Sequence, residues 1–194
     1  MKRLLPILTF FALVMMTSCK KDKKEPVTED VKTEEKSTQT TSHEIKKLQV
    51  PLEAKSGSKV TGNALFSEQD GIVTMIAVIG GLTEGTHAIH IHEKADCSSD
   101  DGTSTGGHWN PTNQPHGQWG SKDGFHKGDI GNLNANANGN ATISMTTNEW
   151  CIGCGDPNKD IVGKAIIIHE GTDDFKTQPT GDAGGRVSCG GIIQ

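Results

Sequence analysis

Closely spaced histidines mark the part of the chain that could bind a metal. The segment His87–His92 places His90 and His92 two residues apart, with Ile89 and Ile91 between and before them. Alternate residues of an extended strand share a face, so the two imidazoles point one way and the two isoleucines the other. Two imidazoles on one strand can bind one metal ion, although such a pair is equally compatible with a structural role.

A second group of metal-binding side chains follows within 22 residues: His108, His116, His126 and Asp129. Three imidazoles and one carboxylate make a closed four-ligand set that suits Zn²⁺, and imidazoles also suit copper. His169 comes later, at the end of the apolar run 166–168. At that position it is either a further ligand or a histidine of the core.

Short strands are the elements expected to position these side chains. β-rich runs flank Asp70-Gly71, and residues 133–137 and 141–145 flank Asn138-Gly139, so we predict a hairpin at each turn. Residues 162–168 form another strand-like run, and no segment of the folded part has a helical period over three turns. These features predict an all-β sandwich or barrel. Two glycine-rich segments, 96–128 and 171–185, are expected to be long functional loops.

The N-terminal segment has the features of an export signal. Residues 1–19 combine a basic start with an apolar run too short for a membrane span of about 20 residues. Small residues precede Cys19, as in the lipobox of bacterial lipoproteins, so we expect Cys19 to be lipidated; an ordinary cleaved signal is the alternative. Residues 20–46, which include His43, are expected to be a flexible charged tether, and residues 47–194 the folded domain.

The net charge of the chain and its expected export restrict its possible binding partners. The net charge of −5 argues against nucleic acid, whose binding proteins usually carry a basic face. We expect an exported protein of the cell envelope, in the periplasm or on the outer surface, that touches the membrane only through its lipid anchor. Disulfides are permitted in that compartment. The sequence is compatible with a monomer or a dimer.

The order of the motifs resembles the copper–zinc superoxide dismutase family over nearly all of residues 47–194. Five segments carry the resemblance: His87–Glu93, Gly106–Pro111, His126–Asn132, His169–Asp174 and Gly181–Gly190. The resemblance implies a flattened eight-stranded Greek-key barrel or sandwich with two long functional loops. It also implies dismutation of superoxide to O₂ and H₂O₂ by one copper and one zinc per chain.

The resemblance further implies a role for each residue. The copper ligands would be His90, His92, His108 and His169, and the zinc ligands would be His108, His116, His126 and Asp129. His108 would therefore bridge the two metals as an imidazolate. Asp173 would link a copper-ligand histidine to a zinc-ligand histidine, His87 would support the ligands from outside the site, and Arg186 would attract the anionic substrate.

The cysteines divide into two pairs. The resemblance implies a disulfide between Cys97 and Cys189. The segment Cys151–Cys154 lies outside the common family pattern. We expect a local disulfide between its two cysteines; a redox-active pair and an additional metal site are the alternatives.

Some features depart from the family pattern. Trp109 stands where phenylalanine is usual, and Pro179 stands where many animal members have a lysine that steers the substrate. Residues 47–194 contain ten basic and seventeen acidic residues, so any attraction for an anion must be local, through Arg186, Lys176 and the metals.

Two other functions are compatible with the same residues. One is a copper or zinc buffer of the same fold without turnover, and the other is a surface interaction module with a structural metal. The complete ligand set and Arg186 favour the enzyme.

Overall fold

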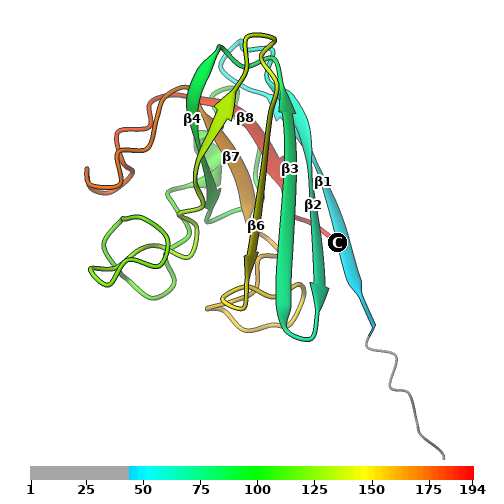
Figure 1. Ribbon diagram of the computed structural model, residues 1–194. Coiled ribbons are helices and arrows are strands. Elements are labelled where there is room, and N and C mark those ends of the chain that lie inside the picture. Colours follow the sequence, from blue (N-terminus) through cyan, green and yellow to red (C-terminus); the bar gives the residue numbers. More distant parts are fainter. Residues whose placement is uncertain (1–43) are drawn as a thin grey trace, which may run out of the picture. The chain divides into compact units, whose positions relative to one another are not determined.

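The structure, a computed structural model, describes residues 44–194 and consists of antiparallel strands (Figure 1). The signal segment, Cys19 and His43 lie outside the described residues. Within the described part, no helix has the length and hydrophobicity needed to cross a membrane, and the one helical element is the 3₁₀ turn η1 (Thr103–Thr105). The eight strands are β1 (Lys46–Ala54), β2 (Thr61–Gln69), β3 (Ile72–Gly80), β4 (Gly85–His92), β5 (Gly131–Ala135), β6 (Ala141–Thr147), β7 (Ala165–His169) and β8 (Arg186–Gly191).

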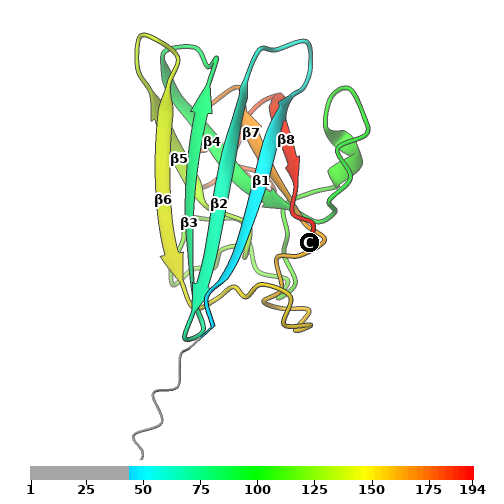
Figure 2. The same ribbon diagram turned by 90° about the vertical axis from the view of Figure 1, so that its right-hand side faces the viewer.

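The strands form one curved sheet in the order β5-β4-β7-β8-β1-β2-β3-β6. Strand β1 joins its two halves, because it pairs with β2 along most of its length and with β8 at its end. Figure 2 shows β6, β3, β2 and β1 in front, with β5, β4 and β7 behind them. The arrangement is a nearly closed Greek-key barrel, which confirms the all-β prediction.

One of the two predicted hairpins forms, and the other does not. Strands β2 and β3 pair directly across Asp70-Gly71, and both turn residues have a positive φ, as a two-residue hairpin turn requires. The hairpin predicted at Asn138-Gly139 was wrong, because β5 pairs with β4 whereas β6 pairs with β3. Asn136 shapes this turn by accepting hydrogen bonds from the backbone N–H groups of residues 138 and 140. The turn therefore connects the two ends of the sheet rather than neighbouring strands.

The core lies between the two halves of the sheet and takes one face of each strand. Strands β2 and β3 alternate, with inward residues such as Phe66 and Met75 completely buried and outward residues such as Ile76 exposed. Strands β4 and β7 differ, because residues on both of their faces are buried. Ile89 and Ile91 belong to the core, and His90 and His92 lie on the other face of β4, where loops must cover them.

Both predicted long loops are hydrogen-bonded to the edges of β4. In the first loop, the backbone N–H of Trp109 donates to the carbonyl of Ile91 (2.8 Å), and the N–H of Ile91 donates to the carbonyl of Gly128 (2.9 Å). In the second, the carbonyl of Gly171 accepts from the N–H of Ala88 (2.7 Å). The loops are therefore attached to the strand whose histidines they cover.

Two disulfides are present. The bond between Cys97 and Cys189 confirms the pairing implied by the resemblance and ties the first loop to β8. The second disulfide joins Cys151 and Cys154, the expected local pair, in the connection between β6 and β7. The side-chain oxygens of Asp160 accept hydrogen bonds from three backbone N–H groups around this pair, those of Gly153, Gly155 and Val162.

Candidate metal centre

Four histidines from three parts of the chain meet on the outer face of β4 and β7. His90 and His92 project from β4, His169 ends β7, and His108 lies in the first loop, where it forms an isolated bridge with His92. Their ring nitrogens lie within 4.8 Å of one another, and all four side chains are buried. The ring centroids of His90 and His108 are 3.9 Å apart, and those of His90 and His169 are 5.0 Å apart. We call these four residues the first cluster.

A second cluster of buried metal-binding groups shares one residue with the first. It comprises His108, His116 and His126 from the first loop and Asp129 immediately after it, with ligand atoms again within 4.8 Å of one another. The ring centroid of His108 lies 5.3 Å from that of His116 and 5.6 Å from that of His126. The structure therefore brings together all the residues that the sequence singled out as metal ligands, in two sets with His108 common to both.

Six buried ring nitrogens in these clusters face one another's sites. Nδ1 of His90 and the Nε2 atoms of His92, His108 and His169 have no hydrogen-bond partner, whereas Nδ1 of His116 and Nδ1 of His126 contact the carboxylate of Asp129 at 3.0 and 3.2 Å. A buried polar atom without a partner is costly, and such atoms are rare in folded proteins. The six histidines of the two clusters each supply one of these nitrogens, and Asp129 supplies carboxylate oxygens. This donor set fits two metal ions.

The opposite nitrogen of several rings is held by an acceptor. His92 donates from Nδ1 to the carbonyl of Gly106 (2.9 Å), and His169 donates from Nδ1 to the carbonyl of Gly184 (3.3 Å). A proton fixed on Nδ1 leaves the lone pair on Nε2 free for a metal. These carbonyls therefore set the tautomer of the rings, and because they are backbone groups, no side-chain pattern pointed to them.

Asp173 accepts a hydrogen bond from one histidine of each cluster. Its Oδ2 accepts from Nε2 of His90 (2.9 Å) and its Oδ1 from Nε2 of His116 (2.9 Å). Asn132 holds the backbone of Asp173 in place by donating from Nδ2 to its carbonyl and accepting from its N–H. Asn132 lies in the motif His126–Asn132, which was the available sequence signal for a role it was not assigned.

Burial governs the protonation of three rings of the first cluster, those of His92, His108 and His169. It lowers the pKa of His92 well below its ordinary value, with a further contribution from neighbouring His108. Burial also lowers the pKa of His169 to about 3 and that of His108 to about 4. These rings are neutral at physiological pH, which is the form that binds metals.

The second cluster is more polar. Burial acts to lower the pKa of His116, but hydrogen bonds to Asp129 and Asp173 outweigh it and raise the pKa to about 9. Burial acts to raise the pKa of Asp129, and hydrogen bonds from the three histidines outweigh it, so that this carboxyl is ionised throughout the physiological range. In the metal-free chain a proton therefore sits on His116, where it balances the carboxylate charge.

Arg186 begins β8, immediately opposite His169 in the pairing of β7 and β8. Its Nη1 donates to the carbonyl of Gly102 (2.8 Å) and to Oγ1 of Thr105 (2.9 Å), both in the first loop. The side chain is half-buried, and this burial lowers its pKa. The electrostatic effect of Arg186 lowers the pKa of His92 and His169, so its positive charge acts on the first cluster.

His87 lies beside the clusters and belongs to neither. Its Nδ1 is 3.0 Å from the carbonyl oxygen of His169, and its Nε2 is 3.0 Å from the carbonyl oxygen of Thr83. Both ring nitrogens have partners, and the contact through Nδ1 lies at the end of β7.

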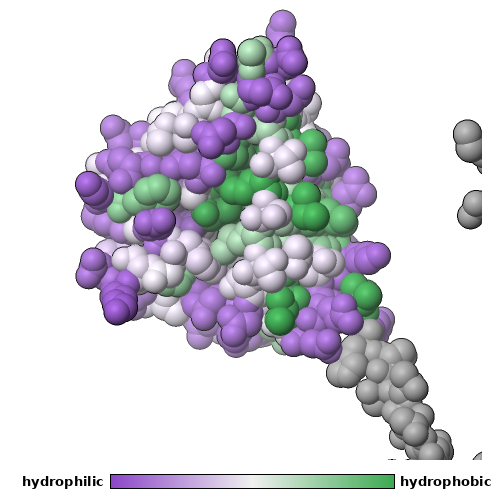
Figure 3. All heavy atoms as spheres, viewed as in Figure 1, coloured by the Kyte–Doolittle hydropathy of each residue, from purple (hydrophilic) through white to green (hydrophobic). Residues whose placement is uncertain are grey.

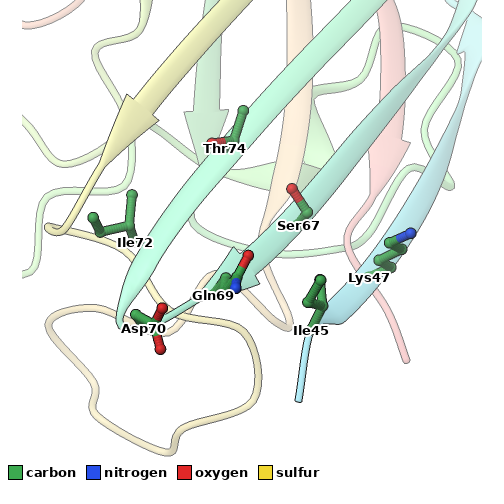
Figure 4. Close-up of a pocket in the computed structure, with 7 residues that line it drawn as sticks. All are labelled: Ile45, Lys47, Ser67, Gln69, Asp70, Ile72 and Thr74. Atoms are coloured by element: carbon green, nitrogen blue, oxygen red, sulfur yellow. The ribbon is translucent and has the colours of Figure 1, made fainter. Parts of the chain in front are cut away.

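The outer face of β2, β3 and β6 carries exposed apolar side chains instead of metal-binding groups. Figure 3 shows apolar residues gathered over these strands, and Leu65, Ile76 and Val78 are among the exposed apolar side chains. A shallow pocket of about 500 Å³ lies at the end of the β2–β3 hairpin (Figure 4). None of its lining residues, Ile45, Lys47, Ser67, Gln69, Asp70, Ile72 and Thr74, is a residue of the two clusters.

The fold and the site define a β-barrel domain with two clusters of side chains that could hold metal ions and that share one histidine. The family model described as copper/zinc superoxide dismutase matches residues 60–192. The chain belongs to the copper/zinc superoxide dismutase family.

Solved structures agree with this assignment. A double mutant of a SOD-like protein from Bacillus subtilis is 34% identical to the chain, with a TM-score of 0.67, and the match covers 75% of this chain and 97% of that one. The clock protein EA4 is 33% identical, with a TM-score of 0.65, and the match covers 76% of this chain and 94% of that one.

Proposed function

We propose that the chain is a superoxide dismutase that uses one copper ion and one zinc ion. The observation that carries this proposal is the set of six buried ring nitrogens, four of them without a hydrogen-bond partner, arranged in two clusters that share His108, with Arg186 beside the first. Two superoxide ions and two protons give one O₂ and one H₂O₂, so the site must attract an anion and supply protons.

The free lone pairs indicate which atoms would hold each metal. Copper would bind Nδ1 of His90 and the Nε2 atoms of His92, His108 and His169. Zinc would bind the Nδ1 atoms of His108, His116 and His126 together with Asp129. Nδ1 of His108 and of His126 lie 2.8 and 3.2 Å from Oδ1 of Asp129, and Nδ1 of His116 lies 3.0 Å from its Oδ2. Asp173 and the carbonyls of Gly106 and Gly184 hold the protons on the opposite nitrogens.

Bound copper would supply one-electron redox chemistry, and zinc, which has no redox change, would act as a structural charge beside it. His108 is the residue suited to move a proton, because its Nε2 faces the first cluster while its Nδ1 is held 2.8 Å from Oδ1 of Asp129. Nε2 of His108 has one lone pair, so it would hold a proton only in the half of the reaction in which it does not bind copper, and it would release that proton to the reduced product.

Arg186 would bind the substrate. A guanidinium keeps its charge at any physiological pH, and this one is half-buried beside the first cluster, where electrostatic attraction is stronger than in bulk water. With ten basic and seventeen acidic residues in residues 47–194, the domain as a whole repels an anion. The attraction must therefore come from this local charge.

We also propose that the protein is exported and anchored to the cell envelope through a lipid on Cys19. The apolar run ahead of Cys19 and the two disulfides of the folded part support this, since disulfides persist in oxidising compartments. Labelling with a radioactive fatty acid tests the anchor: the label should appear on the full chain and be absent from Cys19→Ala. A labelled Cys19→Ala protein, or an unlabelled parent, would overturn it.

The enzymatic proposal is tested by measuring superoxide dismutation with the full chain in three states: metal-free, zinc-only, and loaded with copper and zinc. We expect activity in the copper- and zinc-loaded state alone. A chain that binds copper tightly and does not dismutate superoxide would overturn the proposal and make metal buffering the better account.

A further inference from the structure

A buried hydroxyl group lies between Arg186 and the first cluster. Thr105, the last residue of η1, is completely buried, and its Oγ1 is 2.9 Å from Nη1 of Arg186 and 3.4 Å from Nδ1 of His92. We propose that Thr105 is a positioning residue that fixes the guanidinium of Arg186 in the orientation that receives the anion. This inference rests on the proposed dismutase function for its substrate, although the positioning itself is a property of the chain.

The direction of each hydrogen bond is determined by chemistry. A guanidinium only donates, so Oγ1 of Thr105 accepts from Nη1 of Arg186. The hydroxyl hydrogen is directed to the carbonyl of Gly102 at 2.9 Å, and this carbonyl also accepts from Nη1 at 2.8 Å. The three groups form a closed triangle, in which the hydroxyl hydrogen points to Gly102 and a lone pair of the oxygen faces Arg186. A valine has the same shape as threonine but cannot accept, so it would leave Nη1 with one acceptor.

The loop that carries this hydroxyl is itself fixed to β8. Gly102 has a left-handed conformation (φ 71°), and its Cα packs against the aliphatic part of Arg186, since a Cβ there would lie 3.5 Å from both Cβ and Cδ of the arginine. The N–H of Ser56 donates to the carbonyl of Asp100, and the Ser56 hydroxyl donates to the carbonyl of Arg186. The disulfide from Cys97 closes the other end of the loop. Thr105 is therefore held rigidly relative to the strand that begins at Arg186.

A competing partner for the arginine makes this anchoring useful. Asp101 is the acidic group whose charge acts on Arg186, and it lies on the exposed side of the same loop. An arginine without the Thr105 acceptor could turn toward that carboxylate, which would neutralise the charge offered to the substrate. The buried hydroxyl holds the guanidinium on the side of His92 and His169 instead.

The test compares Thr105→Val with Thr105→Ser in the full chain, because serine keeps the hydroxyl and valine keeps the shape. Azide serves as the anionic probe, titrated optically into the copper- and zinc-loaded proteins. We expect azide affinity to weaken about 3- to 10-fold in Thr105→Val, the loss that one charge-assisted hydrogen bond supports, and to stay within about twofold in Thr105→Ser. Arg186→Ala gives the azide affinity of the site without any guanidinium, which is the lowest value expected. Equal azide affinity in the valine and serine variants would overturn the inference.

A second measurement needs neither copper nor activity. The chain has two arginines, Arg3 and Arg186, so the ¹⁵N NMR signals of the Arg186 guanidinium in the zinc-only protein can be assigned by their loss in Arg186→Ala. We expect slowly exchanging Nη protons in the parent and in Thr105→Ser, and fast exchange in Thr105→Val. If the valine variant does not fold, Thr105→Ala replaces it with less steric demand. Slow exchange in Thr105→Val, or in the Thr105→Ala variant that replaces it, would overturn the inference.

The outcomes separate this inference from the proposed function. A chain without dismutase activity that still shows the difference between valine and serine variants would lose the enzymatic proposal and keep the positioning role. An active chain whose variants all behave like the parent in both measurements would keep the enzyme and lose the role of Thr105.

Discussion

Oδ2 of Asp173 lies 2.9 Å from Nε2 of His90, with both side chains buried. The carboxylate fixes the proton on Nε2, so the free lone pair of His90 is on Nδ1, the atom that has no partner. We expect Asp173→Ala to lower copper affinity by about 10- to 100-fold, the usual cost of removing such a partner. Zinc affinity should fall as well, since Asp173 also holds His116. Competition with a chelator measures both constants.

Asp174 is the matched control for this change. It is an exposed carboxylate one residue further on, whose oxygens accept hydrogen bonds within its own loop, from Lys176 and Thr177. Asp174→Ala should leave both metal affinities within about twofold, because it contacts neither cluster. Equal losses in the two variants would show that loop stability, rather than the contact with His90, controls metal binding.

The stability of the metal-free chain should depend on pH through His116. Its pKa is raised to about 9 in the folded state, because hydrogen bonds to Asp129 and Asp173 outweigh the opposing effect of burial, and its ordinary value is 6.5. A raised pKa stabilises the fold fully below pH 6.5, and this contribution is lost as the pH rises through about 9. Urea unfolding of the metal-free chain between pH 6 and pH 9.5 should show a falling free energy of unfolding.

His116→Gln provides the control for the pH dependence, since glutamine cannot be protonated in this range. The free energy of unfolding of metal-free His116→Gln should stay flat between pH 6.5 and pH 9. Zinc binding should also release a proton from the parent in this range, measured by calorimetry in buffers of different ionisation enthalpy. A parent whose stability does not change over the interval would exclude the proton on His116.

Residue types and spacing predicted the two clusters well, because their ligands come from short, recognisable segments. His90 and His92 share a face of β4 as strand alternation requires. The sequence could not show that β4 would be buried on both sides, which depends on loops folding over it. The sequence also did not show which strands pair with each other. Asn138-Gly139 is a strong local hairpin signal, yet β5 and β6 pair with different strands.

The contacts that set proton positions were the hardest to predict. The acceptors for His92 and His169 are the carbonyls of Gly106 and Gly184, which every residue possesses and no motif identifies. The contact of Thr105 with Arg186 could not be predicted either, because the two residues are 81 positions apart in the chain. Such contacts depend on the packing of distant segments rather than on local pattern.

Removal of His169 should weaken copper binding and leave zinc binding intact. His169 belongs to the first cluster and contributes no atom to the second, whose ligands all come from the segment between β4 and β5. We expect His169→Ala to keep zinc and lose tight copper binding together with dismutation. Metal content after dialysis and the activity of the same samples check this. A variant that retains both copper and activity would contradict the place of His169 in the copper site.

The two disulfides should differ in their contribution to stability, because they close loops of different length. Cys97 and Cys189 are 92 residues apart and Cys151 and Cys154 are three apart. In the chain-entropy model, the long loop contributes about 4–5 kcal/mol to the free energy of unfolding and the short loop about 2 kcal/mol. Urea unfolding of Cys97→Ala/Cys189→Ala and of Cys151→Ala/Cys154→Ala should show this order.

The long disulfide should also affect the site, whereas the short one should not. Cys97 begins the loop that carries Gly102 and Thr105, the two acceptors of Arg186, and Cys189 lies three residues after Arg186 in β8. We expect the Cys97→Ala/Cys189→Ala variant to bind azide more weakly in its folded, copper-loaded form. The Cys151→Ala/Cys154→Ala variant should bind it like the parent, because its loop lies between β6 and β7 and contributes no residue to either cluster. Equal azide affinities in the two variants would show that the loop holds Arg186 without its covalent tie to β8.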